Sequence, residues 1–179
     1  MIAVRLPVIL LLAALAGACS HTDSSTYHDQ FFAFGTLIDV TLYGVDPDLA
    51  AQASEAIASD FHTLHLEWHA WQPGPLTATN ALLAQAEPFR GNPAILPVIR
   101  EANRLAHLSG GLFNPTIGKL VALWGFHDNA LPIGTLPDRQ AIAALVAQAP
   151  SAGDVILRDG MLSSANPAVQ YDLGAFAKG

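Results

Sequence analysis

The sequence is poor in several chemically active groups. It contains one cysteine among 179 residues, which excludes an internal disulfide framework and a cysteine-based zinc site. With 8 Lys and Arg against 15 Asp and Glu, the formal net charge is −7, which argues against a general nucleic-acid binder. Charged residues make up 13% of the chain and hydrophobic residues 51%, which is typical of a folded protein rather than long-range disorder or a coiled coil. The length predicts roughly one domain, two at most.

The N-terminal segment has the pattern of an export signal. Arg5 precedes an apolar run, Leu6–Leu15, that is too short to span a bilayer. Small residues then lead directly to Cys19, although Ala16 stands where Leu is commonest in such signals. The pattern predicts a lipoprotein signal peptide over residues 1–18 and a lipid on Cys19. The chain would then be exported and lipid-anchored to a membrane facing the periplasm or the cell exterior. The alternative is a buried helix with a structural cysteine.

The segment after the lipid site is polar, so residues 19–30 are expected to form a flexible tether. The folded part is expected to begin near Phe31. Alternating β-branched and aromatic residues predict a strand over 36–43. Asp46 and Pro47 then resemble a helix cap with proline in the first turn, followed by helical apolar spacing over 50–69.

Three histidines share one face of that expected helix: His62, His65 and His69. Such a stripe could bind zinc or copper, but no carboxylate or thiol obviously completes the site. The stripe could equally be an ordinary, partly exposed helix surface, or it could border a ligand pocket.

Further elements follow along the chain in the order expected of an α+β domain. Periodicity and cap residues predict helices over 80–86, 95–108, 115–124 and 137–148, and strands over 154–158, 161–164 and 169–173. After the last expected strand, residues 172–179 read as a glycine-rich loop. Loops of this kind commonly bind phosphates through backbone N–H groups, but a plain β-turn explains the pattern as well.

Five ordered motifs resemble those of the ApbE family, the FAD:protein FMN transferases, and the resemblance covers residues 31–179. The first, Phe34-Gly35-Thr36, is similar to the family's M-G-T motif, and residues 68–80 are similar to a segment that usually carries a Tyr and ends at an Asn. The others are residues 109–116 (SGGLFNPT), similar to S-G-G-x-F-D-P-T; residues 121–126 (VALWGF), similar to L-W-G-F; and residues 172–179 (DLGAFAKG), similar to D-L-G-x-x-A-K-G.

The resemblance implies a fold and a reaction. The fold would be α+β, an ApbE-like domain with a mixed or antiparallel sheet and flanking helices. The family binds FAD and Mg²⁺, cleaves the FAD pyrophosphate and joins FMN to a threonine hydroxyl of a target protein, with release of AMP. Typical partners are flavin-accepting subunits of membrane redox complexes.

The resemblance also implies roles for single residues. Phe34 would pack against a ring of FAD, Trp71 would stack on one in place of the usual Tyr, and the backbone carbonyl of Ala175 would bind Mg²⁺. The remaining residues implied to contact FAD are Leu112, Phe113, Asn114, Asp172 and Lys178. Of these, Asn114 replaces the usual Asp and so removes a negative charge near the ligand.

Each of these residues also has a purely structural explanation. Trp71 could be a core residue, Asn114 with Pro115 is a good turn, and Lys178 could be a solvated charge. Two other functions stay open: an FAD-binding or FAD-hydrolysing periplasmic lipoprotein without transferase activity, and a structural lipoprotein. The family's domain is longer than this chain, so the resemblance implies that these residues are its N-terminal part, either a fragment or a truncated gene product, without the family's catalytic His and acidic metal ligands. Such a part is expected to be inactive alone.

Overall fold

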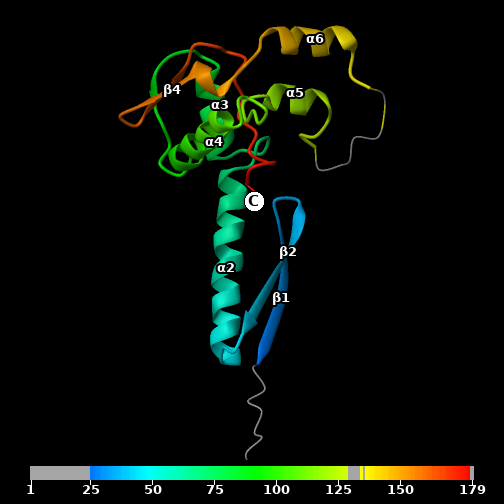
Figure 1. Ribbon diagram of the computed structural model, residues 1–179, viewed down its shortest axis with the longest axis vertical. Coiled ribbons are helices and arrows are strands. Elements are labelled where there is room, and N and C mark those ends of the chain that lie inside the picture. The colour runs from blue at the N-terminus through cyan, green and yellow to red at the C-terminus, as the bar shows by residue number, and fades with distance from the viewer. Residues whose placement is uncertain (1–24, 129–133, 135, 178–179) are drawn as a thin grey trace, which may run out of the picture. The chain divides into compact units, whose positions relative to one another are not determined.

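The computed structural model describes residues 25–128, 134 and 136–177, and Figure 1 labels the elements along the chain. The chain divides into two compact units, one of residues 1–31 and 38–56, the other of residues 32–37 and 57–179. Within the described residues, no helix combines the length and the apolar character needed to cross a membrane.

The first unit holds most of strands β1 (Thr26–Ala33) and β2 (Thr36–Tyr43) and the first part of helix α2 (Pro47–Glu67). The strand predicted over 36–43 is confirmed, and so is the cap, because Asp46 Oδ1 accepts hydrogen bonds from the N–H groups of Asp48 and Leu49. The flexible tether predicted over 19–30 is wrong for residues 26–30. These residues belong to β1, whose Asp29 carboxylate accepts a 2.7 Å hydrogen bond from buried Ser54.

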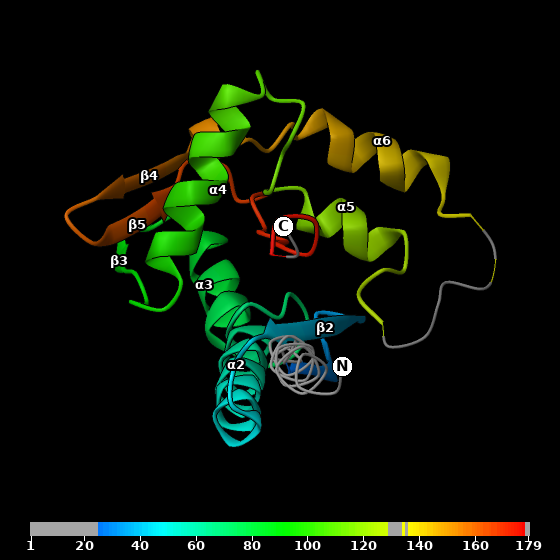
Figure 2. The ribbon, with the colours of Figure 1, turned by 60° about the horizontal axis from the view of Figure 1, so that its bottom comes forward.

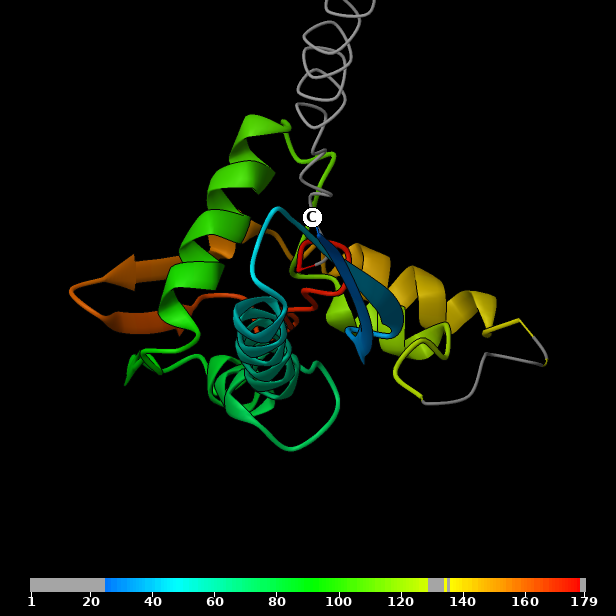
Figure 3. The same ribbon diagram turned by 90° about the horizontal axis from the view of Figure 1, so that it is seen from below.

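The second unit is built around a small antiparallel sheet of order β3-β5-β4, with α3 and α4 against β5 (Figure 2). The strands are β3 (Phe89–Arg90), β4 (Val155–Arg158) and β5 (Met161–Ser164), and the helices are α3 (Pro75–Leu83), α4 (Leu96–Leu108), α5 (Gly118–Leu123), α6 (Arg139–Ala147) and the short 3₁₀ helix η1 (Ala152–Asp154). Figure 3 shows α5 and α6 side by side, away from β4 and β5.

The core of this unit gathers side chains from elements far apart in sequence. Leu76 and Leu83 of α3, Ile99 of α4 and Leu162 of β5 are fully buried together. Removing these large apolar side chains from water is the main stabilising contribution to such a unit. The sheet and these two helices therefore form the packed core that the loops of the unit connect to.

Most predicted elements of this unit are confirmed with shifted ends. The helix predicted over 80–86 begins earlier, at Pro75, because the Thr77 hydroxyl accepts a hydrogen bond from Gly74 N–H and caps the first turn. The helix predicted over 115–124 is shorter, Gly118–Leu123. In the helix predicted over 137–148, Asp138 is the N-cap, and its carboxylate accepts from Ala141 N–H.

The strand predicted over 169–173 is wrong, because this segment forms only an isolated parallel bridge between Ile117 and Gln170. On one edge, Gln170 N–H donates to Thr116 C=O, and Gly118 N–H donates to Gln170 C=O at 2.8 Å. A Cβ on Gly118 would lie 2.7 Å from that carbonyl oxygen, so only glycine allows this approach.

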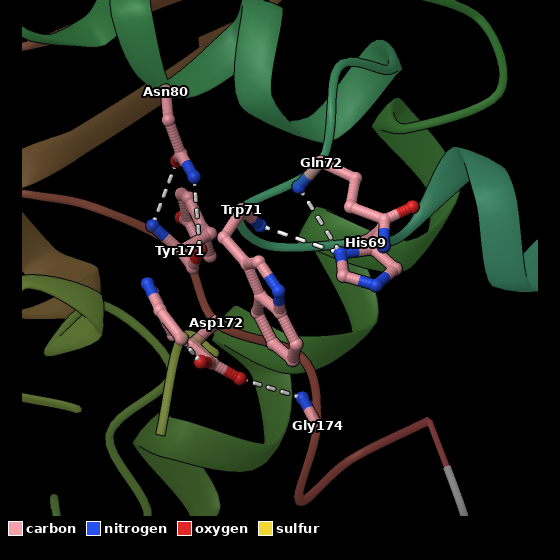
Figure 4. A network of polar contacts seen from close by, with 8 residues as sticks. His69, Trp71, Gln72, Asn80, Tyr171, Asp172 and Gly174 are labelled. Atoms are coloured by element: carbon pink, nitrogen blue, oxygen red, sulfur yellow. Dashed lines mark hydrogen bonds and ion pairs between the residues drawn. The ribbon is translucent and has the colours of Figure 1, made fainter. Parts of the chain in front are cut away.

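The other edge of the same segment is paired by a side chain. The Asn80 amide donates from Nδ2 to Tyr171 C=O at 2.9 Å and accepts at Oδ1 from Tyr171 N–H at 2.8 Å (Figure 4). Both residues are buried, so water does not replace these bonds. The Asn80 side chain thus takes the place of a neighbouring strand and fixes the backbone immediately before Asp172.

Candidate functional site

The turn between β1 and β2, which belongs to the second unit, carries an aromatic ring. Phe34 and Gly35 both have positive φ angles, 51° and 73°, as a two-residue type I′ turn requires. Phenylalanine is strained in this region of backbone space, and such strain persists where surrounding contacts maintain it. The Phe34 ring stacks on Trp68 at a centroid distance of 6.1 Å, and Phe34 N–H donates to His65 Nδ1 at 3.2 Å.

Beside this turn lies a cavity of about 450 Å³. Its walls come from the hairpin turn, the C-terminal end of α2 with the loop that follows, and the segments at 128 and 172–174. Its lining residues are Phe32, Phe34, Gly35, His65, Trp68, His69, Ala70, Trp71, Gln72, Asp128, Asp172 and Gly174. The Trp68 indole N–H is buried and has no hydrogen-bond partner among the described residues. This combination of apolar rings and a few polar groups is typical of a small-molecule site.

His69 organises the loop that carries Trp71. Its Nδ1 accepts from the N–H groups of Gln72, at 3.2 Å, and Trp71, at 3.5 Å (Figure 4). Accepting at Nδ1 places the proton of the neutral ring on Nε2. Burial lowers the pKa of His69, and its neighbours His65 and His127 lower it further, against the smaller raising effect of Asp172. His69 is therefore held neutral, in the form that caps the loop.

Asp172 also lines the cavity, and its carboxylate makes two hydrogen bonds. Oδ2 pairs with His127 Nε2 at 2.7 Å, and Oδ1 accepts from Gly174 N–H at 2.8 Å. Burial alone would raise the pKa of Asp172, but the hydrogen bonds from His127 and Gly174 outweigh it and hold the pKa below its usual range. The cavity thus contains a fixed, ionised carboxylate beside aromatic rings, an arrangement suited to a heteroaromatic ligand with hydrogen-bond donors.

Trp71 contacts imidazole rings from two different segments. Its indole meets the His69 ring at 4.2 Å in an edge-to-face arrangement, and it stacks on the His127 ring at 5.1 Å with 20° between the planes. His127 is absent from the motifs recognised in the sequence. Its only sequence signal is that it directly follows the Leu123–Phe126 stretch, and nothing in that spacing shows that it reaches Asp172.

The structure brings Phe34, Trp71 and Asp172 to one cavity, whose lining does not include Leu112, Phe113 or Asn114. Leu112 is 95% exposed, and Phe113 stacks on Phe176 instead. Ala175 lies in an exposed turn, in which Leu173 C=O accepts from the N–H groups of residues 176 and 177.

Asn114 has its amide occupied by structural hydrogen bonds. Its Nδ2 donates to Pro150 C=O, and its Oδ1 accepts from the backbone and hydroxyl of Thr116. Asn114 therefore makes the turn that its sequence context suggests and lies outside the 450 Å³ cavity. Cys19 and Lys178 lie outside the described residues, as does the expected signal peptide.

The three histidines predicted to share one helix face have different surroundings in the structure. His65 and His69 line the cavity, whereas His62 is exposed. In residues 25–128, 134 and 136–177, no group of three or more His, Cys, Asp or Glu side chains is arranged to hold a metal ion. These residues thus offer no zinc or copper site, and two of the three histidines border the pocket instead.

Comparison with known proteins gives consistent matches. The model of the ApbE family matches residues 34–179. The FAD:protein FMN transferase of Rhodobacter capsulatus is 38% identical over 151 residues, which cover 84% of this chain and 29% of that protein. The enzyme of the same name from Klebsiella pneumoniae (strain 342) is 28% identical over 148 residues, which cover 76% of this chain and 42% of that protein.

Solved structures match the fold as well. The ApbE protein of Thermotoga maritima superposes with a TM-score of 0.73 at 25% identity, over 87% of this chain and 49% of that one. The flavin transferase ApbE of Vibrio cholerae gives a TM-score of 0.69 at 25% identity, over 87% and 50%. The expected α+β fold is therefore confirmed, and the chain spans about half the length of these structures.

The neutral state of His69 leads to a prediction about pH. Because its pKa is lowered on folding, the folded protein binds fewer protons than the unfolded chain once the pH falls below the ordinary histidine value, about 6.5. The stabilising contribution is therefore present above that value and is lost as the pH falls. We expect His69→Asn, which keeps an acceptor and cannot titrate, to lose less unfolding free energy between pH 7.5 and 5 than the wild type.

Chemical denaturation at the two pH values checks this expectation. His107→Asn is the matched control, because His107 is exposed at the end of α4. If His69→Asn and the wild type lost the same unfolding free energy between pH 7.5 and 5, the conclusion that folding lowers the pKa of His69 would be wrong.

Proposed function

Because the chain belongs to the ApbE family, we propose that the protein to which it belongs is an FAD:protein FMN transferase. The observation that carries the proposal is the convergence of Phe34, Trp71 and Asp172 on one cavity from three separate segments. These are positions at which the family resemblance implies contacts with FAD. The names of the relatives support the same reaction.

In the proposed reaction, the hydroxyl oxygen of a target threonine bonds to the flavin-side phosphorus of FAD. The pyrophosphate P–O bond breaks, AMP leaves as its dianion, and the hydroxyl proton passes to solvent. Since the chemistry is phosphoryl transfer, the protein's main contribution is positioning and charge stabilisation. In the described residues, Phe34 and Trp71 supply ring surfaces, and the Asp172 carboxylate accepts a hydrogen bond from the ligand. We propose flavin-accepting subunits of membrane redox complexes as the protein partners.

Magnesium is part of this proposal only for the full-length protein. The described residues supply one of the oxygen ligands implied by the resemblance, the carbonyl of Ala175, and no acidic cluster beside it. These described residues do not form a Mg²⁺ site by themselves.

A second function is favoured by one residue. Asn114 replaces the acidic residue of the family motif, and its amide is hydrogen-bonded to Pro150 C=O and to the N–H and hydroxyl of Thr116. If the missing charge is needed for transfer, the protein would bind or hydrolyse FAD without modifying a partner.

A flavinylation assay separates these functions. Full-length protein is incubated with FAD, Mg²⁺ and a threonine-bearing acceptor, and in-gel flavin fluorescence and free AMP are measured. We expect a fluorescent acceptor band, with Asp172→Asn and Trp71→Ala slowed about tenfold or more because each removes one ligand contact. Gln52→Ala, on the exposed surface of α2, is the control expected to act as wild type.

The other outcomes of this assay are distinct. AMP and free FMN without a fluorescent acceptor would indicate a hydrolase, and tight FAD binding without AMP would indicate a binding protein. The assay is also run with residues 1–179 alone in place of the full-length protein. We expect no band from them, because they match only 29% and 42% of the length of these two relatives.

We also propose that the protein is exported and lipid-anchored through Cys19. The basic Arg5, the short apolar run and the small residues before the cysteine support this. In cells fed a labelled fatty acid, the full-length protein should take up label and partition with membranes, whereas Cys19→Ala should do neither. Equal labelling of Cys19→Ala would refute the anchor.

A further inference from the structure

His127 makes two contacts that use different parts of one imidazole ring. Its Nε2 is hydrogen-bonded to Asp172 at 2.7 Å, along the ring plane. Its face lies against the indole of Trp71, at 5.1 Å and 20°. The first contact fixes the direction of the ring within its plane, and the second fixes the plane itself. His127 in turn limits the movement of both partners.

The local sequence explains why His127 is held in this place. Helix α5 ends in a Schellman motif: Phe126 N–H donates to Val121 C=O, and Gly125 N–H donates to Ala122 C=O. Gly125 has a φ of 81°, which the motif requires at this position. The motif reverses the chain after the helix and delivers His127 to a place where its side chain is only 9% exposed.

The hydrogen-bonded pair of His127 and Asp172 is enclosed enough for its loss to matter. The side chain of Asp172 is 14% exposed, and a carboxylate at that depth is costly if its partner is removed. Without His127, Asp172 would either turn toward solvent or take up a proton. Trp71, which is 40% exposed, would lose the ring against which it is stacked.

We propose that His127 is a positioning residue that couples Trp71 and Asp172 into one ligand-binding unit. It acts through these two side chains and does not itself line the cavity. The inference rests on the proposed function in one respect, namely that the ligand is a flavin adenine dinucleotide, which offers an aromatic ring to Trp71 and hydrogen-bond donors to Asp172.

Two substitutions each remove one of the two contacts of His127 and keep the other. His127→Phe keeps a ring against Trp71 and removes the hydrogen bond to Asp172, whereas His127→Gln keeps a donor to Asp172 and removes the ring. His127→Ala removes both, and His62→Ala, on the exposed face of α2, is the matched control. Dissociation constants for FAD are measured by flavin fluorescence with full-length protein, together with the unfolding free energy of each variant.

We expect His127→Ala to weaken FAD binding about tenfold or more, His127→Phe and His127→Gln to lose less, and His62→Ala to bind as wild type. The decisive measurement is a double-mutant cycle. If His127 acts through Asp172, then His127→Phe combined with Asp172→Asn binds no more weakly than Asp172→Asn alone. Independent, multiplying losses, or a His127→Ala variant with wild-type affinity, would overturn the proposal. A merely structural role would lower stability without producing this coupling.

A ligand-free arm keeps the inference separate from the proposed function. The fluorescence of Trp71 is obtained as the difference between each protein and its Trp71→Phe counterpart. We expect acrylamide to quench this signal more strongly in His127→Ala than in wild type or His127→Phe, because the stacked ring no longer shields the indole. Equal quenching would overturn the coupling even if FAD binds. Failure of the wild type to bind FAD, with the expected quenching, would count against the proposed function alone.

Discussion

The arrangement of the candidate site depends on one side-chain amide. Asn80 pairs with both backbone polar groups of Tyr171, as a neighbouring strand would, while residues 115–118 pair with the opposite edge of the same segment. An unpaired buried N–H or C=O costs about 1–3 kcal/mol, so this pairing strongly favours one backbone path. Asp172 is the next residue on that path. The direction of its carboxylate is therefore set by an asparagine from helix α3, which lies outside the cavity itself.

A series of side-chain contacts links Asp172 to the loop that carries Trp71. His127 joins the carboxylate to the indole of Trp71, and Trp71 meets His69, which caps its own loop. Each ring limits the freedom of the next, so the walls are arranged before a ligand arrives. A site ordered in advance loses less conformational entropy on binding, which favours affinity. The apolar core beneath, where α3 and α4 pack on β5, provides the rigid support.

The sequence predicts features that depend on neighbouring residues and misses those that depend on distant partners. The Asp46 and Asp138 caps and the strand at 36–43 follow local rules and are confirmed. The polar residues at 26–30 predict a tether, whereas they form part of β1, in which the Asp29 carboxylate accepts a hydrogen bond from Ser54. Apolar and polar residues alternate over 169–173, which predicts a strand, but one edge of this segment is paired by a side chain 91 residues away. His127 was missed for the same reason. The motifs do identify Phe34, Trp71 and Asp172, which the cavity brings together, whereas the part of Leu112 and Asn114 in ligand binding stays a prediction.

The most direct test of this account is the affinity of full-length Asn80→Ala for FAD, measured at a temperature where the variant remains folded. Asn80 does not line the cavity, so it influences the ligand only through Tyr171 and Asp172. The account predicts binding about tenfold weaker or more, comparable to Asp172→Asn, while Gln52→Ala binds as wild type. A folded Asn80→Ala protein with wild-type affinity would contradict the claim that this amide sets the site.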